Sequence, residues 1–257
     1  MTLQQSLEKV RTSCRRVQLP HFRGLVTDLI DAPMGSKLPR PQAFLVEQDP
    51  HWTLPTHFHQ EHQFQLFVGG KGSMGRHRLP PLAVHYASPH SAYGPLISDA
   101  AGIAYLTLRA VSDRGAWVLP DKRADLLTRI AKQQIHAAPG HAMDTTALRQ
   151  LRAPELETLI AAQAGGPGAW VLRLPPHAHG MAPAPSPASA GRFHVITQGG
   201  IQSSQSPLEA LALLWTDPAE EAPMQAGPNG AEVVIMEFPE QAARSFVDDM
   251  NLRAAPY

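Results

Sequence analysis

The sequence predicts an all-β protein that consists of two small β-barrels in tandem, joined by a helical connector. Three observations support this prediction. Short apolar segments bounded by turn residues recur at barrel-like spacing, and the chain is rich in proline (25) and glycine (19). The second half of the chain also repeats the first. At 257 residues, the chain is long enough for two domains of ordinary size.

The composition excludes several classes of protein. The 22 basic and 22 acidic side chains give a net charge of zero, whereas a nucleic-acid-binding protein would show a basic face. The single cysteine, Cys14, excludes an intramolecular disulfide. No apolar run has the length of a membrane span, and the first residues lack the apolar core of a signal peptide. We therefore expect a soluble cytoplasmic protein without a nucleic-acid or membrane partner.

The first half is expected to contain an arm and a barrel. Residues 1–20 should form a short amphipathic helical arm that ends at Pro20, because Leu3, Leu7 and Val10 share one side of a helix. The first barrel is expected over residues 21–120. Its predicted strands and its glycine-rich hairpin turn are, in order, 43–47, 52–59, 63–68, the turn 69–75, 82–87 and 103–110.

The next segment changes character. Residues 121–166 are expected to form a helical connector, with one helix from Asp121 to about His136 and a second over residues 147–164. The glycines and proline of 165–168 should stop the second helix. The second barrel is then expected over residues 167–257.

The repeat is visible as a nearly constant offset. Residues 174–179 align with residues 54–59 at an offset of 120, and from Phe64 onward the offset is 129. The nine extra residues fall within Gly180–Gly191, which should be an exposed loop because of its proline and alanine content. Residues 206–215 have helical propensity, but the repeat predicts that most of them form strands.

The densest polar chemistry lies in residues 54–72, LPTHFHQEHQFQLFVGGKG. His57 and His59 are two residues apart, so on a strand both imidazoles point to the same face. Gln63 follows at the start of the next predicted strand, and Gly70 lies seven residues further on. Polar groups that point into a small barrel can form a metal or ligand pocket.

This pattern resembles the first motif of the cupin superfamily, which is His-x-His followed by Glu and Gly. His57, His59 and Gly70 match the motif, and Gln63 stands where Glu is usual. Residues 88–94 resemble the turn of the second cupin motif, with Tyr93 at the place of a third His. Together with the duplication, this resemblance implies a bicupin, with two jelly-roll (double-stranded β-helix) barrels.

The second half matches the motif less well. His177, His179 and Gly199 match, whereas Arg192 takes the place of Glu and Ala222 that of the third His. We therefore expect the second barrel to be degenerate and free of metal, because an arginine repels a cation.

Alternation along the second half predicts that His177, His179, Arg192 and His194 face inward. Arg192 is expected to bind an anion or to pair with a nearby acid such as Glu220 or Glu221.

The cupin resemblance implies a divalent transition metal, such as Fe, Mn, Ni or Zn, with His57, His59 and Gln63 as ligands. Tyr93 is the catalytic candidate, as a ligand or a proton donor. The candidates for substrate binding are Gln65, His90, Arg192 and His194, and those that could replace a missing ligand are Glu61, His62, His85 and His90. The alternatives are a packing pair of histidines, a buried amide at Gln63 and a plain hydrogen-bonding role for Tyr93.

Two functions from different classes follow. The first is a metal-dependent enzyme that acts on a small polar organic molecule as an oxygenase, isomerase or lyase. The second is a non-catalytic binding module or a structural bicupin, which the missing Glu and third His favour. A small-molecule ligand is the expected partner, and a homodimer is a further expectation.

Overall fold

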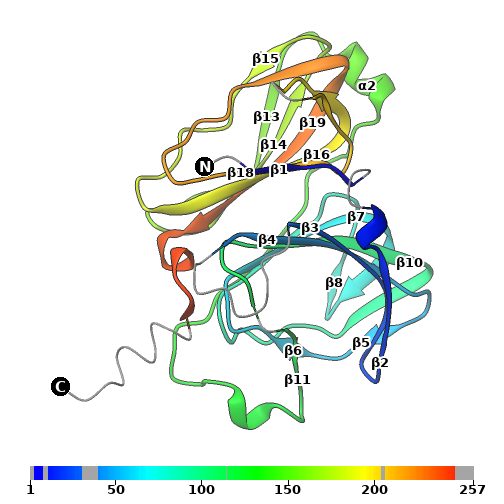
Figure 1. Cartoon of the computed structure of the whole chain (residues 1–257), viewed down its shortest axis with the longest axis vertical. Coiled ribbons are helices and arrows are strands. Elements are labelled where there is room, and N and C mark those ends of the chain that lie inside the picture. Colours follow the sequence, from blue (N-terminus) through cyan, green and yellow to red (C-terminus); the bar gives the residue numbers. More distant parts are fainter. Residues whose placement is uncertain (1–2, 8–10, 31–39, 114, 204–205, 247–257) are drawn as a thin grey trace. The chain divides into compact units, whose positions relative to one another are not determined.

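The computed structural model describes residues 3–7, 11–30, 40–113, 115–203 and 206–246, and these residues form a nearly all-β structure (Figure 1). They divide into two compact units. One unit holds residues 12–138 and 241–246, and we call its main sheet barrel 1. The other holds residues 3–11 and 139–240, and we call its main sheet barrel 2.

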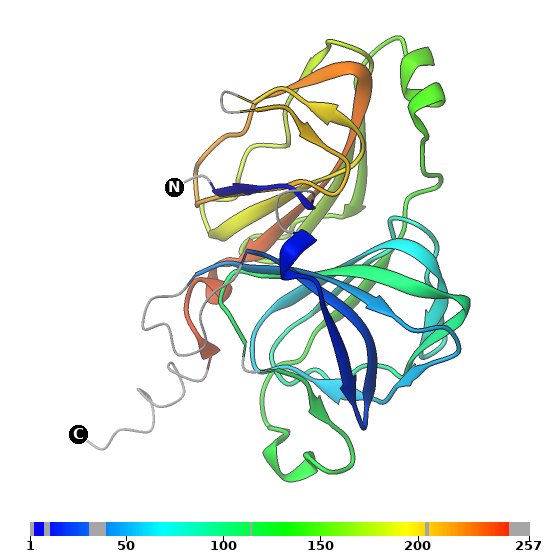
Figure 2. The ribbon, with the colours of Figure 1, turned by 45° about the vertical axis from the view of Figure 1, so that its right-hand side comes forward.

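Barrel 1 is an antiparallel sheet with the strand order β12-β9-β7-β10-β4-β3-β2, in which β5 also pairs with β10 and β8 with β7. Its strands are β2 (Arg15–Leu19), β3 (Phe22–Ile30), β4 (Gln42–Gln48), β5 (Thr53–Leu54), β7 (Gln63–Met74), β8 (His77–Arg78), β9 (Val84–Ala87), β10 (Leu96–Arg109) and β12 (Gln134–Ala137). A separate pair is made by β6 (His57–Phe58) and β11 (Trp117–Val118). Figure 2 shows from a second side how the long strands curve around one interior.

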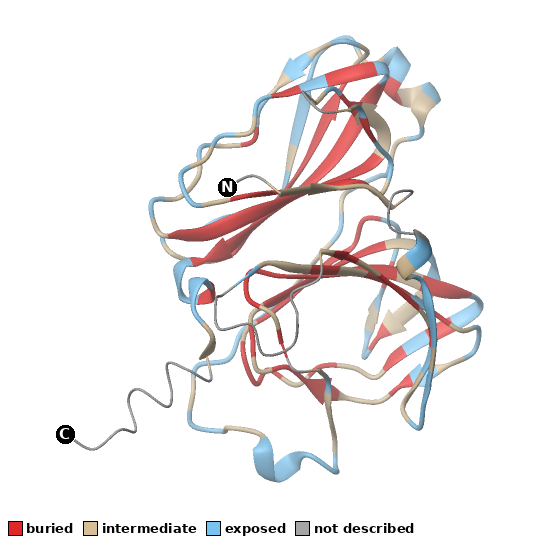
Figure 3. Ribbon diagram, viewed as in Figure 1, coloured by how far each residue is buried: buried red, intermediate tan, exposed pale blue. Residues whose placement is uncertain are grey.

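Barrel 2 is an antiparallel sheet with the order β1-β18-β16-β19-β14-β13, in which β15 also pairs with β19 and β17 with β16. Its strands are β1 (Leu3–Gln5), β13 (Glu155–Ile160), β14 (Gly168–Leu174), β15 (His179–Gly180), β16 (Ser189–Ile201), β17 (Leu208–Glu209), β18 (Leu213–Thr216) and β19 (Met224–Pro239). All seven residues of β14 are buried, and much of β16 and β19 is buried with them (Figure 3).

The strand order confirms the predicted duplication of an all-β unit. The order β9-β7-β10-β4 in barrel 1 recurs as β18-β16-β19-β14 in barrel 2. Strand β18 begins and ends 129 residues after β9, and residues 208–209 and 213–216 form strands as the repeat predicts. Gly70 and Gly199 have φ angles of 69° and 65°, which places both in the left-handed region that favours glycine.

The alignment needs one correction within the last long strand. Phe64 pairs with Leu108, but its repeat Phe193 pairs with Met236, so β19 is offset from β10 by 128 residues and not by 129. Because side chains alternate between faces, a shift of one residue changes which side chains are equivalent. Arg109 therefore corresponds to Glu237.

The first strand of each half lies in the sheet that the other half mainly forms. Strand β1 precedes barrel 1 in the chain but pairs with β18 of barrel 2. Strand β12 begins the second half but pairs with β9 of barrel 1. Since β9 and β18 are equivalent strands, each sheet gains its extra strand at the equivalent edge.

The predicted helices are mostly wrong. In residues 1–20 the described elements are β1, the 3₁₀ helix η1 (Arg11–Ser13) and β2. Residues 121–166 contain the 3₁₀ helix η2 (Arg123–Asp125), strands β12 and β13, and the six-residue helix α2 (Thr145–Gln150). The edges of both sheets offer unpaired backbone groups, and pairing with them outweighs weak helical propensity.

Capping also differs from the prediction. Asp144 caps α2 by accepting a hydrogen bond from the amide of Ala147 at 2.8 Å. Asp121 caps no helix. The last described element is the 3₁₀ helix η3 (Glu240–Ala243). No helix in the described part of the chain has the length and apolar character needed to cross a membrane.

The glycine at the bulge of β7 generates a stability prediction. A Cβ on Gly70 would overlap the carbonyl oxygen of Gly102, and the φ angle of Gly70 disfavours any other residue. We expect Gly70→Ala to lower the free energy of unfolding by more than about 1 kcal/mol. Gly69→Ala is the control, because its Cβ would meet Ala104 at an ordinary 3.5 Å. Chemical unfolding of both variants tests this, and equal stabilities would contradict it.

Candidate functional site

Short strand β6 carries the first histidine of the motif into barrel 1. His57 and Tyr93 exchange backbone hydrogen bonds of 3.1 and 2.9 Å, and β11 pairs with β6 on the other side. His57 and His59 are 2% and 8% exposed, so both imidazoles are buried as the alternation predicts.

His57 is held as a neutral imidazole. Its Nδ1 donates to the carbonyl oxygen of Pro55 at 2.8 Å, which leaves Nε2 without a proton. Burial, followed by the nearby His59, lowers the pKa of His57 to about 3. At neutral pH, its Nε2 therefore presents a lone pair.

His59 is fixed by a carboxylate from the loop after β10. Its Nδ1 lies 2.7 Å from Oδ2 of Asp113 and 3.1 Å from Nη2 of Arg109. One ring nitrogen cannot both donate and accept, and an ionised carboxylate only accepts. We therefore assign the proton to Nδ1, donating to Asp113, so that Nε2 of His59 is also bare. Burial and then Arg109 lower the pKa of His59 below its usual value.

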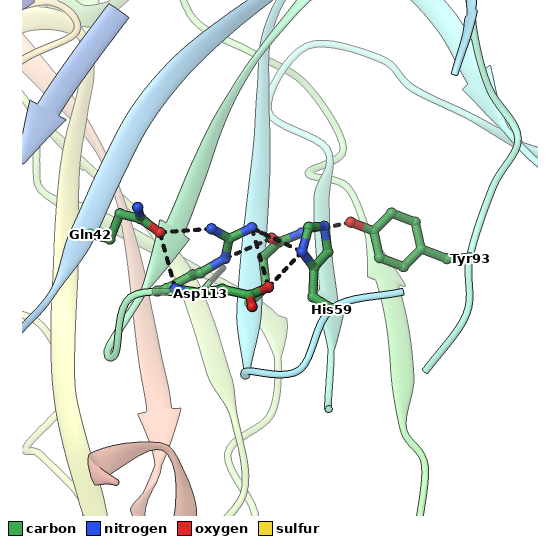
Figure 4. A network of polar contacts seen from close by, with 6 residues as sticks. Gln42, His59, Tyr93 and Asp113 are labelled. Carbon is green, nitrogen blue, oxygen red and sulfur yellow. Dashed lines mark hydrogen bonds and ion pairs between the residues drawn. The ribbon is translucent and has the colours of Figure 1, made fainter. Parts of the chain in front are cut away.

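Figure 4 shows a network of polar groups in which Gln42, His59, Tyr93 and Asp113 are labelled. Arg109, at the end of β10, joins these groups. Its Nε and Nη2 donate to Oε1 of Gln63 at 3.0 and 2.5 Å, and its Nη1 donates to Oε1 of Gln42 at 2.7 Å. Nη2 is also 3.9 Å from Asp113. The guanidinium is 3% exposed, so this charge is buried, paired and hydrogen-bonded.

Gln63 links Arg109 to Tyr93. While its Oε1 accepts from the guanidinium, its Nε2 donates to the hydroxyl of Tyr93 at 2.7 Å. Burial raises the pKa of Tyr93 well above its usual value, so the hydroxyl keeps its proton. Both polar atoms of the Gln63 amide are therefore engaged by protein groups.

Most of these groups line a cavity of about 430 Å³ in barrel 1, whereas Tyr93 does not line it. The polar lining side chains include Gln42, His57, His59, Gln63, Gln65, Thr107, Arg109 and Asp113. The apolar lining side chains include Val17, Leu19, Phe22, Val26, Phe44, Val46 and Leu54. The cavity is therefore amphipathic, and its size lies within the usual range for small-molecule sites.

Several other candidates lie outside this cavity. His90 accepts from the amide of Leu127 at 3.3 Å and stacks on Phe58 with ring centroids 5.1 Å apart. Glu61 accepts from Ser245 Oγ at 2.6 Å and from the amide of Phe246 at 3.0 Å. Burial raises the pKa of Glu61 to about 7.

The other two candidates, His62 and His85, contact neighbouring side chains of barrel 1. His62 Nδ1 lies 2.6 Å from the hydroxyl of Tyr86, and His85 Nδ1 lies 3.1 Å from Oε1 of Gln65. No hydrogen bond joins the side chains of Glu61, His62, His85 or His90 to the ring of His57 or His59, and the buried Nε2 of His85 has no partner among the described residues. Gln65 does line the cavity.

Barrel 2 has no equivalent arrangement of histidines. His177 and His179 are exposed, so they do not face inward as the alternation predicted. His194 is buried, and its Nε2 lies 3.2 Å from Oγ1 of Thr216, while its Nδ1 has no partner in the described structure. Burial, followed by Arg192, lowers the pKa of His194 to about 3.

Arg192 and Glu237 occupy the positions that Gln63 and Arg109 occupy in barrel 1. Arg192 Nε donates to Glu237 at 2.8 Å, so the acid it meets is neither Glu220 nor Glu221. The guanidinium also donates to the carbonyls of Pro183 and Ala184, and the amide of Ser186 donates to Glu237 at 2.9 Å. The loop expected to be exposed is therefore tied to this ion pair, and Ala182 within it is buried.

Two residues of the site were not predicted from the sequence. Arg109 lies in the predicted strand 103–110, and Tyr105, Thr107 and Arg109 alternate along β10 and all line the cavity. That alternation was the available signal. Asp113 lies in a loop, so no periodicity could have placed it beside His59.

No protein-family model and no curated protein matches the sequence. Solved structures do match, and their identities are so low that they establish only the fold. An oxalate decarboxylase from Lactobacillus farciminis is 11% identical, with 99% of this chain and 90% of that chain covered and a TM-score of 0.59. The bacterial pirin YhhW from Escherichia coli, in complex with nickel(II), is 9% identical, with coverages of 93% and 99% and a TM-score of 0.52.

An 11S globulin from Wrightia tinctoria with an auxin binding site is 12% identical, covers 94% of this chain and 84% of that chain, and has a TM-score of 0.58. The structural neighbours are cupin proteins. The chain has the bicupin fold. The neighbours include an enzyme, a protein in complex with a metal and a globulin, so the bicupin fold alone does not decide the function.

The residues of barrel 1 fit part of a metal site. The ring centroids of His57 and His59 are 5.3 Å apart, so the two imidazoles are close enough to share one ion. Gln63 does not fit as a ligand, because both ends of its amide are engaged. Among the described residues, no group of three His, Cys, Asp or Glu side chains could hold an ion. Barrel 1 therefore offers a metal ion two imidazole ligands and leaves its other coordination positions open.

The buried guanidinium generates the second prediction. Arg109→Gln removes one partner of a buried network and leaves Asp113 without its neighbouring cation. We expect the free energy of unfolding to fall by about 3–5 kcal/mol. Arg16→Gln is the control, because its ion pair with Asp49 is exposed and its loss should change stability little. Unfolding curves in urea measure both, and equal small effects would contradict the account.

Proposed function

We propose that barrel 1 holds a divalent transition metal ion on Nε2 of His57 and His59 and binds a small organic molecule in the adjoining cavity. The observation that carries the proposal is the fixing of both imidazoles through Nδ1, by Pro55 in one case and by Asp113 in the other. Metal-bound histidines have this kind of support, which sets the tautomer and makes Nε2 the ligand atom.

A bound ion would supply Lewis-acid or oxygen-activating chemistry, which suits an oxygenase, isomerase or lyase. The residues of the chain have separate tasks. The apolar walls from β3 and β4 would hold the body of the ligand and exclude water. Tyr93, kept protonated by burial, accepts from Gln63 and does not line this cavity, so it would hold Gln63 in place rather than donate a proton to the ligand. Arg109 orients Gln63, and Gln63 in turn orients Tyr93.

Some expectations from the sequence stay predictions. They are the assignment of barrel 1 to residues 21–120 and barrel 2 to residues 167–257, the homodimer, and the binding roles of Gln65, His90, Arg192 and His194. The ligand expected here is less polar than the sequence implied, because apolar side chains such as Phe22, Phe44 and Val46 line the cavity together with its polar groups.

Metal content per chain tests the proposal. We expect close to one ion per chain in the wild type after reconstitution with Fe, Mn, Ni or Zn, and loss of most of it in His57→Ala, because one imidazole holds an ion weakly. His177→Ala is the matched control, since His177 occupies the corresponding motif position but is exposed. Elemental analysis after gel filtration measures all three proteins. Equal loss in the two variants, or no ion in the wild type, would refute the metal site.

Arg109 favours a second candidate function, a metal-free binding module. A buried guanidinium beside His59 and Gln63 disfavours a second cation, while two bare imidazole nitrogens can accept from a ligand hydroxyl. In this case the cavity would bind its ligand after all metal has been removed.

Filling the cavity tests this candidate. Val17 lines the cavity from β2, whereas the next residue, Gln18, is exposed. If the candidate is correct, chelator-treated wild type and Gln18→Trp should bind benzyl alcohol, and Val17→Trp should lose about tenfold or more in affinity because the added ring occupies the site. Isothermal titration calorimetry measures the three proteins. Equal affinities in the two variants, or binding only with metal present, would refute the metal-free module.

A further inference from the structure

We propose that a second pocket of barrel 1, beside β8 and β12, binds a small oxyanion, such as the phosphate or carboxylate group of a small molecule. This pocket has a volume of about 450 Å³. It shares no lining residue with the cavity that His57 and His59 line. It is thus a separate site, and the proposed function does not depend on it.

The lining of this pocket is polar and basic. Its polar side chains include Arg76, His77, Gln134 and His136, and Met74 and Tyr93 also line it. No carboxylate lines the pocket in the described part of the chain. A concave surface with cationic and N–H donors and without acidic groups favours an anion.

Two of these side chains belong to a column of three imidazoles. The rings of His77 and His136 are 4.0 Å apart and nearly parallel, and those of His136 and His85 are 4.3 Å apart at 10°. Stacked rings cannot hydrogen-bond to one another, because their N–H groups lie in the ring planes. The N–H groups of His77 and His136 therefore require partners outside the column.

Two imidazoles of the column, His136 and His85, are neutral. Burial, followed by His77, lowers the pKa of His136 to about 4, and burial lowers the pKa of His85 well below its usual value. Of these two imidazoles only His136 lines the pocket, where it serves as a neutral N–H donor, and the positive charge of the pocket comes from Arg76. Arg76 is exposed, and none of the ion pairs between described residues involves it.

The same geometry argues against a metal ion in this pocket. The nitrogen lone pairs of stacked rings lie in nearly parallel planes, here of rings about 4 Å apart, so they do not converge on one point. The described residues here also include no group of three His, Cys, Asp or Glu side chains that could hold an ion. A guanidinium at the site would further repel a cation. An oxyanion, in contrast, accepts from Arg76 and from an imidazole N–H at the same time.

The test is calorimetric titration of the full chain with inorganic phosphate and, separately, with acetate, at constant ionic strength. We expect saturable binding of at least one of them in the wild type, and a loss of about tenfold in affinity in Arg76→Gln. His77→Gln should weaken binding in the same direction. Arg78→Gln is the matched control, because Arg78 is an exposed arginine two residues after Arg76, on β8, and does not line the pocket.

The outcomes separate the explanations. Binding of phosphate alone identifies a phosphate-type ligand, and binding of acetate alone identifies a carboxylate. No saturable heat with either anion overturns the proposal, and so does equal weakening in Arg76→Gln and Arg78→Gln, which would indicate only a general surface charge effect. Chemical-shift changes of the His77 and His136 ring signals on titration would locate the anion, and their absence with saturable binding would also overturn it.

Discussion

Barrel 1 depends on the requirement that a buried arginine be fully paired. Arg109 ends β10 inside the barrel, where an unpaired charge would cost several kcal/mol. Its partners therefore come from separate segments: Gln42 from β4, Gln63 from β7 and Asp113 from the loop after β10. The hydrogen bonds and ion pair of this one guanidinium therefore fix the orientations of Gln42, Gln63 and Asp113.

The same two sheet positions are used differently in the two barrels. In barrel 1 they hold an amide and an arginine, Gln63 and Arg109, and in barrel 2 an arginine and a carboxylate, Arg192 and Glu237. In barrel 2 the opposite charges of Arg192 and Glu237 balance each other, and the pair also hydrogen-bonds to the inserted loop at Pro183 and Ser186. In barrel 1 the amide of Gln63 is neutral, so Asp113 supplies the negative charge near Arg109. Asp113 also orients His59. One duplicated frame thus supports a tied-down loop in barrel 2 and a cavity in barrel 1.

The sequence was sufficient for the features that periodicity and repetition encode. The all-β class, the duplication, the inward direction of His57 and His59 and the strands of residues 208–216 follow from alternation and offset. The sequence was insufficient for features that depend on contacts between segments far apart in the chain. Strands β1 and β12 form because distant sheet edges accept them, and Asp113 meets His59 across 54 residues of chain. A one-residue difference in β19 also hid the equivalence of Arg109 and Glu237.

The central claim is that fixing Nδ1 of His57 and His59 creates one metal position in barrel 1 and none in barrel 2. Anomalous diffraction from a crystal of the full chain grown with manganese(II) or nickel(II) tests this most directly. The account predicts a single strong peak at about 2.0–2.2 Å from Nε2 of both His57 and His59, with Gln63 still bound to Arg109. A peak coordinated by Gln63, a peak beside Arg192, or no peak near the two histidines would contradict it.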